Sequence, residues 1–400
     1  MTSTWIYWIT AISIFLVIYH HLGYPLLLKV LVRCTPSDKE GNADQKMLKD
    51  NDLPTITVLM PAYNEARWIA DKIRNLASLD YPADKLDIIV ACDGCSDDTA
   101  AIARQTALET PCSHLNLYVA EYEENRGKVA VLNKSMCLAR GDLVALTDIS
   151  ALISIDAFRI AAQRFTDEKL GVMNSQYCLM NANSSESNYW KYQCKIQQFE
   201  AKLGSSLGSH GALYIIRREL YCPLPADTIN DDFVLPMNIV AQGYRADVDT
   251  NIRAVELEAS SNQQDFRRRL RIGAGNCQQL FRLMTLLMPS RGGVAFTFAS
   301  GKALRVVMPF LMIAALVGSI AIAPTHWFFA CAALVQSVIY LSILACQLAG
   351  YEPKNAIVRA IRYLVAGHTA NLIGTLRYIS GLERGRWTRV STASSISRED

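Results

Sequence analysis

The hydrophobic positions along the chain form two patterns: long continuous apolar runs near both ends, and shorter runs between them. The long runs occupy residues 5–32, 303–323 and 326–349, and each is long enough to cross a bilayer as a helix. The short runs TITVLM, LDIIVA and DLVALTD alternate with the helix-like stretches WIADKIRNLASL and GKVAVLNKSMCLA. Strands separated by helices at this spacing predict an α/β domain with a mostly parallel sheet, flanked by transmembrane helices.

The first long run predicts an uncleaved transmembrane anchor over residues 1–33, because neither a basic leader nor a small-residue cleavage site accompanies it. Lys29 and Arg33 at its far end place the following part of the chain in the cytoplasm. Residues 34–53 are polar and charged and predict a linker, and residues 54–260 have the composition of the α/β domain.

Two adjacent histidines, His20 and His21, lie inside the first run. Neighbouring residues on a helix point to different faces, so the pair is not expected to bind one metal ion jointly. Packing at the membrane interface is the preferred interpretation.

The C-terminal part predicts further membrane contacts. Residues 261–302 form an amphipathic interfacial region, and residues 303–349 form two transmembrane helices joined by the tight turn APTH. Residues 350–400 contain a weakly apolar helix, interfacial or transmembrane, and a basic tail. If the stretch 361–380 crossed the membrane, the basic tail would lie outside, so we favour an interfacial or partly inserted helix. The prediction is a multi-pass protein of the cell inner membrane with a cytoplasmic catalytic domain.

Composition narrows the function classes. Hydrophobic residues make up 51% of the chain and charged residues 19%, which fits a protein that is part soluble domain and part membrane segment. The net charge of +3 is too small to indicate nucleic-acid binding, so no nucleic-acid partner is expected. The 11 cysteines have no framework spacing, and we expect reduced thiols.

Polar residues follow three of the short apolar runs. TITVLM leads into PAYNEA, DIIVA into CDGCSDD and LVALT into DIS. Ligands of a parallel α/β sheet bind at the carboxyl ends of its strands, where these side chains would meet. The order and spacing of the three segments therefore predict a pocket for a nucleotide and a cation.

The motifs PAYNEA, DGCSDDT, NRGKVAVLN, TDIS and DDF occur in the order seen in family 2 glycosyltransferases with the GT-A fold. The chain most resembles the membrane-embedded cellulose-, chitin- and hyaluronan-synthase-like enzymes of bacterial polysaccharide assembly. The resemblance covers about residues 54–275, and more loosely the terminal helices. It implies a Rossmann-like nucleotide-sugar-binding domain whose substrate is a UDP-sugar.

The resemblance implies a nucleotide-sugar site made from several strand ends. Pro61, Tyr63 and Glu65, together with Asp93, match the nucleoside pocket, where an ionised Asp accepts hydrogen bonds from the base or ribose. Lys128 matches the segment on the diphosphate side and would supply a point charge. The alternatives are a turn-forming Asp-Gly pair and a solvated lysine at a helix start.

TDIS matches the metal-binding D-x-D position of the family. The resemblance makes Asp148 a ligand of Mg²⁺ or Mn²⁺, which would bridge the two phosphates and stabilise the leaving nucleoside diphosphate. Ser150 stands where the second Asp is usual, which weakens the match. The alternative role of Asp148 is a cap at the end of a strand.

TINDDFVLP resembles the family's catalytic acidic motif. Inverting sugar transfer needs a carboxylate that removes the proton of the acceptor hydroxyl, and Asp232 matches this base, with Asp231 as its acidic neighbour. Adjacent carboxylates raise one pKa, which favours a base that works near neutral pH. The alternative is that the two acids cap the helix FVLPMNIVAQG.

QQDFRRRLRIGAG falls where processive members of the family carry Q-x-x-R-W. Arg269 and Arg271 match the arginine positions and would bind the diphosphate, while Arg268 replaces Gln and Ile272 replaces Trp. The alternative is a basic interfacial helix that contacts anionic lipid headgroups. The missing Trp puts long-chain synthesis in doubt.

The sequence thus predicts an inverting, UDP-sugar-dependent transferase that extends a polysaccharide or glycosylates a lipid-linked acceptor at the cytoplasmic face of the bilayer. Two alternatives remain open: a non-processive enzyme that adds one sugar to a lipid carrier, and an inactive nucleotide-sensing scaffold subunit. Each of these alternatives is compatible with export-complex subunits as partners.

Overall fold

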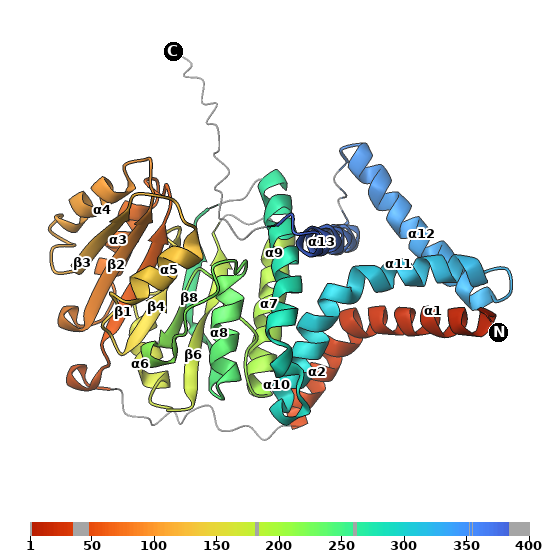
Figure 1. The fold of residues 1–400 in the computed structure, drawn as a ribbon, viewed down its shortest axis with the longest axis horizontal. Helices are drawn as coiled ribbons and strands as arrows, with labels where there is room; N and C mark the ends of the chain where they lie inside the picture. The colour runs from red at the N-terminus through yellow and green to blue at the C-terminus, as the bar shows by residue number, and fades with distance from the viewer. Residues whose placement is uncertain are drawn as a thin grey trace, which may run out of the picture.

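The computed structural model describes residues 2–34, 48–180, 184–258, 262–351, 353 and 355–383 (Figure 1). A sheet covered by helices forms one end of the molecule, and a group of long apolar helices forms the other end. Most of the predicted linker, residues 35–47, and most of the predicted basic tail, residues 384–400, lie outside the described residues.

The sheet has eight strands in the order β3-β2-β1-β4-β7-β6-β8-β5. Neighbours within β3-β2-β1-β4 and the pair β6–β8 are parallel, whereas β4–β7, β6–β7 and β5–β8 are antiparallel. The predicted mostly parallel sheet is therefore confirmed, with an antiparallel insertion around β7. The strands are β1 (Ile56–Ala62), β2 (Leu86–Asp93), β3 (Asn116–Tyr122), β4 (Leu143–Leu146), β5 (Ala151–Ile153), β6 (Leu170–Leu179), β7 (Tyr214–Arg217) and β8 (Arg245–Glu256).

Both faces of the sheet are buried, which explains why the central strands read as continuous apolar runs. Val58 and Met60 of β1 face one core, which also contains Phe158, whereas the intervening Leu59 faces a second core together with Leu132. Helices α3 (Ile69–Ala77), α4 (Thr99–Ala107) and α6 (Ala157–Arg164) contribute to the first core, and α5 (Lys128–Met136) and α8 (Asp231–Ala241) to the second.

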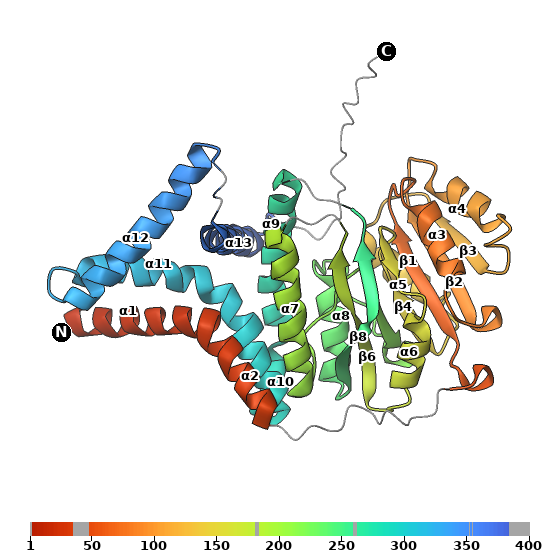
Figure 2. The same ribbon diagram turned by 180° about the vertical axis from the view of Figure 1, so that it is seen from behind.

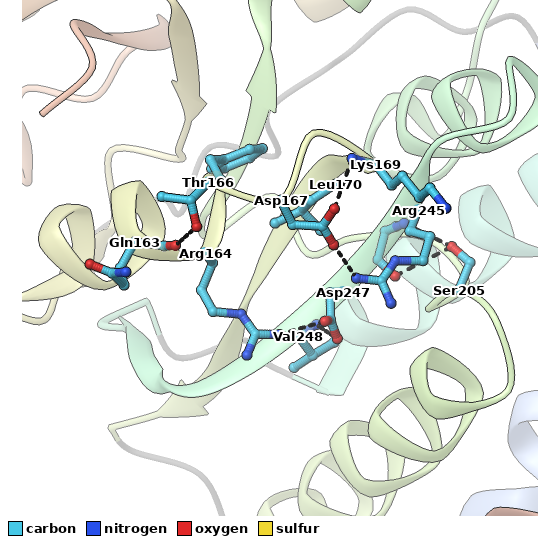
Figure 3. Close-up of polar contacts among 12 residues, drawn as sticks. Gln163, Arg164, Thr166, Asp167, Lys169, Leu170, Ser205, Arg245, Asp247 and Val248 are labelled. Atoms are coloured by element: carbon cyan, nitrogen blue, oxygen red, sulfur yellow. Dashed lines mark hydrogen bonds and ion pairs between the residues drawn. The ribbon is translucent and has the colours of Figure 1, made fainter. Parts of the chain in front are cut away.

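Two ion pairs join the amino ends of β6 and β8 (Figure 3). The Arg164 guanidinium lies 2.5 Å from the Asp247 carboxylate, and the Arg245 guanidinium lies 2.7 Å from the Asp167 carboxylate. Asp167 also accepts a hydrogen bond of 2.9 Å from the Lys169 backbone N–H. The side chains of Arg164, Asp167, Arg245 and Asp247 are called the amino-edge cluster, because they lie where the parallel pair β6–β8 begins.

Two long helices, α7 (Ser184–Lys202) and α9 (Asn262–Arg282), stand between the sheet and the apolar helices (Figure 2). Beyond them lie α1 (Thr2–Ile18), the π-helix η1 (Tyr19–Gly23), α2 (Tyr24–Cys34), α10 (Gly293–Thr297), the π-helix η7 (Phe298–Ala303), α11 (Leu304–Ile322), α12 (Trp327–Leu348) and α13 (Ala356–Ile379). Short 3-10 turns occur at Asp50–Asp52, Ala83–Lys85, Arg218–Leu220, Met284–Leu287 and Pro289–Arg291.

Three helical segments are long and apolar enough to cross a membrane. They are Thr4–Cys34, Gly293–Ile322 and Trp327–Leu348. Large apolar side chains such as Trp5, Leu334 and Leu341 are exposed on them, as expected for surfaces that face lipid. Helix α13 is seen end-on in both views while α1 and α11 run across the picture, so α13 lies transverse to these two helices (Figures 1 and 2).

Candidate active site

The carboxyl ends of β1 and β4 meet the start of α5 and α8 in one pocket. Among the predicted site residues, Pro61, Lys128, Asp148 and Asp231 line this pocket. The remaining lining residues are Leu132, Leu146, Thr147, Gly211 and Tyr214. The structure thus brings together residues from five separate segments of the sequence.

Lys128 lies between two of the carboxylates. Its Nζ is 3.0 Å from Asp148 Oδ1 and 3.5 Å from Asp231 Oδ2. Burial lowers the pKa of Lys128, but the surrounding carboxylates outweigh burial and raise it, so the ammonium stays charged. Burial acts in the opposite direction on Asp148, yet the charge of Lys128 and its hydrogen bond lower the pKa of this carboxyl. The pair is therefore ionised, and it is oriented toward the pocket.

Asp93 holds the loop that precedes Lys128. Its carboxylate accepts hydrogen bonds from the backbone N–H groups of Arg126, at 2.9 Å, and Gly127, at 2.8 Å. Gly127 has φ of 91°, a conformation that side chains disfavour, and helix α5 begins directly after it. With 1% of its surface exposed, Asp93 orients the start of α5 and hence Lys128. Its predicted contact with the nucleoside stays a prediction.

The PAYNEA segment is tied to the loop after β2. The Ser96 backbone N–H donates to Asn64 Oδ1 at 2.8 Å, and the Ala66 N–H donates to Asp97 Oδ2 at 3.1 Å. The Glu65 N–H donates to Thr99 Oγ1 at 2.8 Å, and the Glu65 side chain is buried. These bonds fix the loop that contains Tyr63, whose side chain is half-buried.

Asp231 and Asp232 are the first two residues of α8. Asn230 is the N-cap residue, and its side chain makes no capping hydrogen bond. The Phe233 and Val234 N–H groups donate to the Asn230 carbonyl. Burial and the charge of Asp231 together raise the pKa of Asp232 to about 6, although Lys128 opposes both. A carboxylate with this pKa is largely ionised at pH 7 and still basic enough to accept a proton.

The arginines of α9 point in different directions. Desolvation lowers the pKa of Arg268, but neighbouring acidic groups, including Asp148 and Asp232, outweigh it and raise that pKa. The positive charge of Arg271 also lowers the pKa of Asp232. The Arg269 guanidinium instead lies 3.9 Å from the ring centroid of Tyr363 on α13. The structure therefore places Arg268 and Arg271 toward the acids and Arg269 toward α13.

Lys72 supports the Asp148 segment and was not predicted. It is fully buried, and its Nζ donates to Thr147 Oγ1 at 2.8 Å and to the Ala151 carbonyl at 2.5 Å. Burial lowers the pKa of Lys72 to about 7, although Asp148 and Glu256 raise it. The sequence contains one signal for this role, because Lys72 occupies a core-facing position of α3 between Ile69 and Ile73.

An aromatic cluster adjoins the pocket on the side of α7. The rings of Tyr177 and His210 are stacked with centroids 5.1 Å apart, and Trp190 meets both rings edge-on. His210 precedes Gly211, where an added Cβ would come within 2.5 Å of Asp148 Oδ2. The GSHG segment can therefore reach the acids only because it carries glycine here.

A family model described as glycosyltransferase-like family 2 matches residues 54–275, more than half of the 400 residues. The chain belongs to this family. Its fold is GT-A-like, as the motifs predicted. The predicted roles of the individual site residues stay predictions.

Curated relatives match parts of the chain, among them the following two. The beta-monoglucosyldiacylglycerol synthase of Trichormus variabilis is 29% identical over 138 residues, which are 34% of this chain and 28% of the relative. The poly-beta-1,6-N-acetyl-D-glucosamine synthase of Staphylococcus aureus is 25% identical over 204 residues, 49% of this chain and 48% of the relative. The chain thus spans less than half the length of these curated relatives.

A similarity to a solved structure extends further along the chain. The mannosyltransferase PcManGT from Pyrobaculum calidifontis, solved in complex with GDP-Man and Mn²⁺, is 25% identical. The superposition covers 91% of this chain and 99% of that protein, with a TM-score of 0.68. The likeness therefore includes the apolar helices as well as the sheet domain.

Proposed function

We propose that the chain is an inverting transferase of the inner membrane that moves a sugar from a nucleoside-diphosphate sugar to a lipid-linked or polysaccharide acceptor at the cytoplasmic face. The observation that carries this proposal is the half-buried Asp232 with its pKa near 6, next to the ion pairs of Lys128 with Asp148 and Asp231. A base with this pKa suits proton removal from a hydroxyl at neutral pH.

In the proposed reaction, one group of residues removes the proton of the acceptor and another stabilises the leaving group. As the acceptor oxygen attacks C1 of the sugar, Asp232 accepts the proton of the hydroxyl and the bond from C1 to the diphosphate breaks. Lys128, Arg268 and Arg271 interact with the acids of the site, and in this proposal their positive charge stabilises the leaving diphosphate. Attack from the face opposite the leaving group inverts the configuration at C1.

The residues present fit a divalent cation that the donor helps to hold. Among the described residues, no group of three His, Cys, Asp or Glu side chains forms a complete metal site. Mg²⁺ is commonly held by one or two carboxylates together with substrate phosphates, and Asp148 offers such a carboxylate. The Glu256 carboxylate hydrogen-bonds with Ser150, the residue that replaces the usual Asp, and it interacts electrostatically with Asp148. A second carboxylate is therefore close to the proposed metal position. Mg²⁺ or Mn²⁺ bound there would neutralise charge on the departing diphosphate.

A UDP-sugar is the expected donor, from the resemblance to polysaccharide synthases. The GDP-Man bound to PcManGT makes a GDP-sugar the competing donor. The substitution of Ile272 for the usual Trp favours a single addition over a long chain. The transverse orientation of α13 supports the interfacial interpretation of residues 361–380.

The test is a donor panel with the full chain in membranes: UDP-glucose, UDP-N-acetylglucosamine, UDP-galactose, UDP-glucuronate and GDP-mannose. We expect transfer from one of them by the unmodified protein and no transfer by Asp232→Asn. The control is Asp71→Asn, which changes an exposed acid paired with Arg74 on α3. Equal transfer by both variants would remove Asp232 as the base. Binding of a donor without any turnover would instead favour the scaffold.

A further inference from the structure

An apolar groove opens on the surface where the sheet domain meets the apolar helices. It has a volume of about 360 Å³, and every residue that lines it is apolar. The lining comes from two segments: Phe281 of α9 and Met284 of the 3-10 turn after it, and Ala299, Ala303 and Val307 of η7 and α11. An apolar cavity of about 150 Å³ is enough to bind benzene, so this groove has room for a segment of a hydrocarbon chain.

The groove lies at the boundary between membrane and water. Half of its lining belongs to the segment Gly293–Ile322, which is long and apolar enough to cross a membrane. The other half includes Phe281 and Met284, whose large apolar side chains are exposed. Arg282 and Arg291 come shortly before the span, as arginines do beside the cytoplasmic end of a membrane helix. The hydrocarbon chain of a membrane lipid therefore has direct access to the groove.

The short helix η7 connects the groove with the proposed catalytic acids. Phe298 of η7 is fully buried, and its ring centroid lies 6.4 Å from that of Phe233. Phe233 belongs to the first turn of α8 and directly follows Asp232. Lys302 Nζ, also from η7, lies 5.1 Å from the centroid of the same Phe233 ring. The helix η7 therefore contributes two alanines to the groove and contacts the start of α8.

The end of α9 links the groove to the loop that precedes the acids. The Arg282 guanidinium lies 2.7 Å from the Asp227 carboxylate. One turn earlier in α9, the buried Gln278 side chain accepts a 2.9 Å hydrogen bond from the Ile229 N–H and donates one of 2.8 Å to the Asp227 carbonyl. Because η7 and α9 both extend from the groove to this region, a lipid whose tail lies in the groove has its head group on the side of Asp232.

We propose that the groove holds the hydrocarbon tail of the lipid acceptor and so directs the reactive oxygen of the acceptor toward Asp232. The inference rests on the proposed function for its assumption of a lipid acceptor. The apolar lining suits the tail alone, and the polar site around Asp232 receives the head group. An ordinary bilayer lipid lacks a head group that fits this site, so the acceptor is preferred over it.

The test uses the full chain in phosphatidylcholine nanodiscs without any donor. Three probes with a photoreactive diazirine in the tail are compared at equal mole fraction: a diacylglycerol, a polyprenyl phosphate and phosphatidylcholine itself. We expect one of the first two to label residues 280–287 and 299–307 about tenfold more than phosphatidylcholine does, a preference that one net hydrogen bond to the head group gives. The exposed side chains Leu334 and Leu341 of α12 should be labelled equally by all three probes.

Two variants fill the groove. Ala299→Phe and Ala303→Phe place a ring where the tail lies. Each should lower labelling by the preferred lipid about tenfold, the loss expected when about two methylene groups are no longer buried. Ala321→Phe is the matched control, because it adds the same ring at an exposed position of α11 outside the groove, and it should be labelled normally. The thermal midpoint of each variant checks that it is folded.

Three results would overturn the proposal. Unchanged labelling in both filled variants would show that the tail does not lie in the groove. Equal labelling of the groove by phosphatidylcholine would make it an ordinary surface that faces the bilayer. A groove that no probe labels would be covered by protein, such as a second copy of the chain.

Labelling of Asp232→Asn distinguishes this proposal from the proposed activity. The variant should be labelled as the unmodified protein is, although it transfers no sugar. If no donor supports transfer but the filled variants still lose the label, the groove proposal stands and the proposed function fails. If transfer occurs and the filled variants keep both the label and the acceptor KM, only the groove proposal fails.

Discussion

Charged side chains are arranged differently at the two ends of the strands, the amino ends of β6 and β8 and the carboxyl ends of β1 and β4. In the amino-edge cluster each carboxylate has its own arginine, and the four side chains are partly exposed (Figure 3). At the carboxyl edge, Asp148, Asp231 and Asp232 surround one lysine, and the side chains of Lys128 and Asp231 are only 22% and 12% exposed. Matched pairs hold strands together, whereas a buried excess of one sign leaves a carboxylate with a shifted pKa and a capacity to react.

The largest effect should follow from removing the proposed base. Asp232→Asn should lower kcat by about a thousandfold, within the range for a general base, because the amide cannot accept the acceptor proton. Its thermal midpoint should not fall, since the substitution removes a buried charge whose pKa burial has already raised. Steady-state kinetics and thermal unfolding of the same preparation check both parts. A kcat within threefold of the unmodified protein would contradict the assignment.

A smaller effect should follow at Asp148. Asp148→Asn removes the carboxylate that pairs with Lys128 at 3.0 Å, and it removes the carboxylate offered to a divalent cation. We expect the donor KM to rise by about tenfold to a hundredfold, the scale of charge-assisted hydrogen bonds. A titration of Mn²⁺ against activity should shift to higher concentrations in this variant. Unchanged donor and metal dependence would show that the Asp148 carboxylate serves the strand end alone.

A substitution of Lys72 tests whether its hydrogen bonds hold the segment that contains Asp148 in place. Lys72→Met keeps the apolar stem but removes the bonds to Thr147 and Ala151, leaving polar groups without their buried partner. The free energy of unfolding should fall by about 1–3 kcal/mol. The donor KM should rise while the acceptor KM stays the same, because the segment that presents Asp148 loosens. Lys85→Met, which changes a half-buried lysine bound to the Asn51 and Leu53 carbonyls away from the acids, is the matched control.

The smallest effect on catalysis should come from the amino edge. Asp247→Asn breaks the pair with Arg164 and should lower the free energy of unfolding by about 0.5 kcal/mol, as for a partly exposed ion pair. Turnover should stay within twofold. Chemical denaturation and an activity assay on one preparation make the comparison with Asp232→Asn direct. A large loss of activity here would mean that the two edges do not differ in the way described.

Parallel strands made the meeting of the acids predictable. Once TITVLM, LDIIVA and DLVALTD are strands of one sheet, their carboxyl ends lie at the same end of that sheet, and Pro61 of β1 and Asp148 after β4 do line one pocket there. Asp93 illustrates the limit of this reasoning. Its place at a strand end follows from the pattern, but its bonds to the Arg126 and Gly127 N–H groups depend on the path of a loop.

The rotation of α9 about its axis, which decides where each arginine points, was harder to predict from the sequence. Successive residues of α9 point about 100° apart, so the choice between Arg268 and Arg269 depends on how α9 packs against α13. At Gly273 an added Cβ would come within 2.8 Å of Asn371 Cα, so this contact sets the rotation. The sequence shows the arginines but not this distant packing partner. For the same reason, the expectation that His20 and His21 point to different helix faces did not anticipate that both rings lie beside His368 of α13.

The pH dependence of kcat/KM for the acceptor tests the central claim most directly, that burial together with neighbouring acids makes Asp232 a base. Protonation removes the base, so kcat/KM should be level above pH 7 and should fall about tenfold per pH unit below a midpoint near 6. The residual activity of Asp232→Asn should lack this limb. A rate that is independent of pH between 5 and 8, or a limb that persists in Asp232→Asn, would contradict the account.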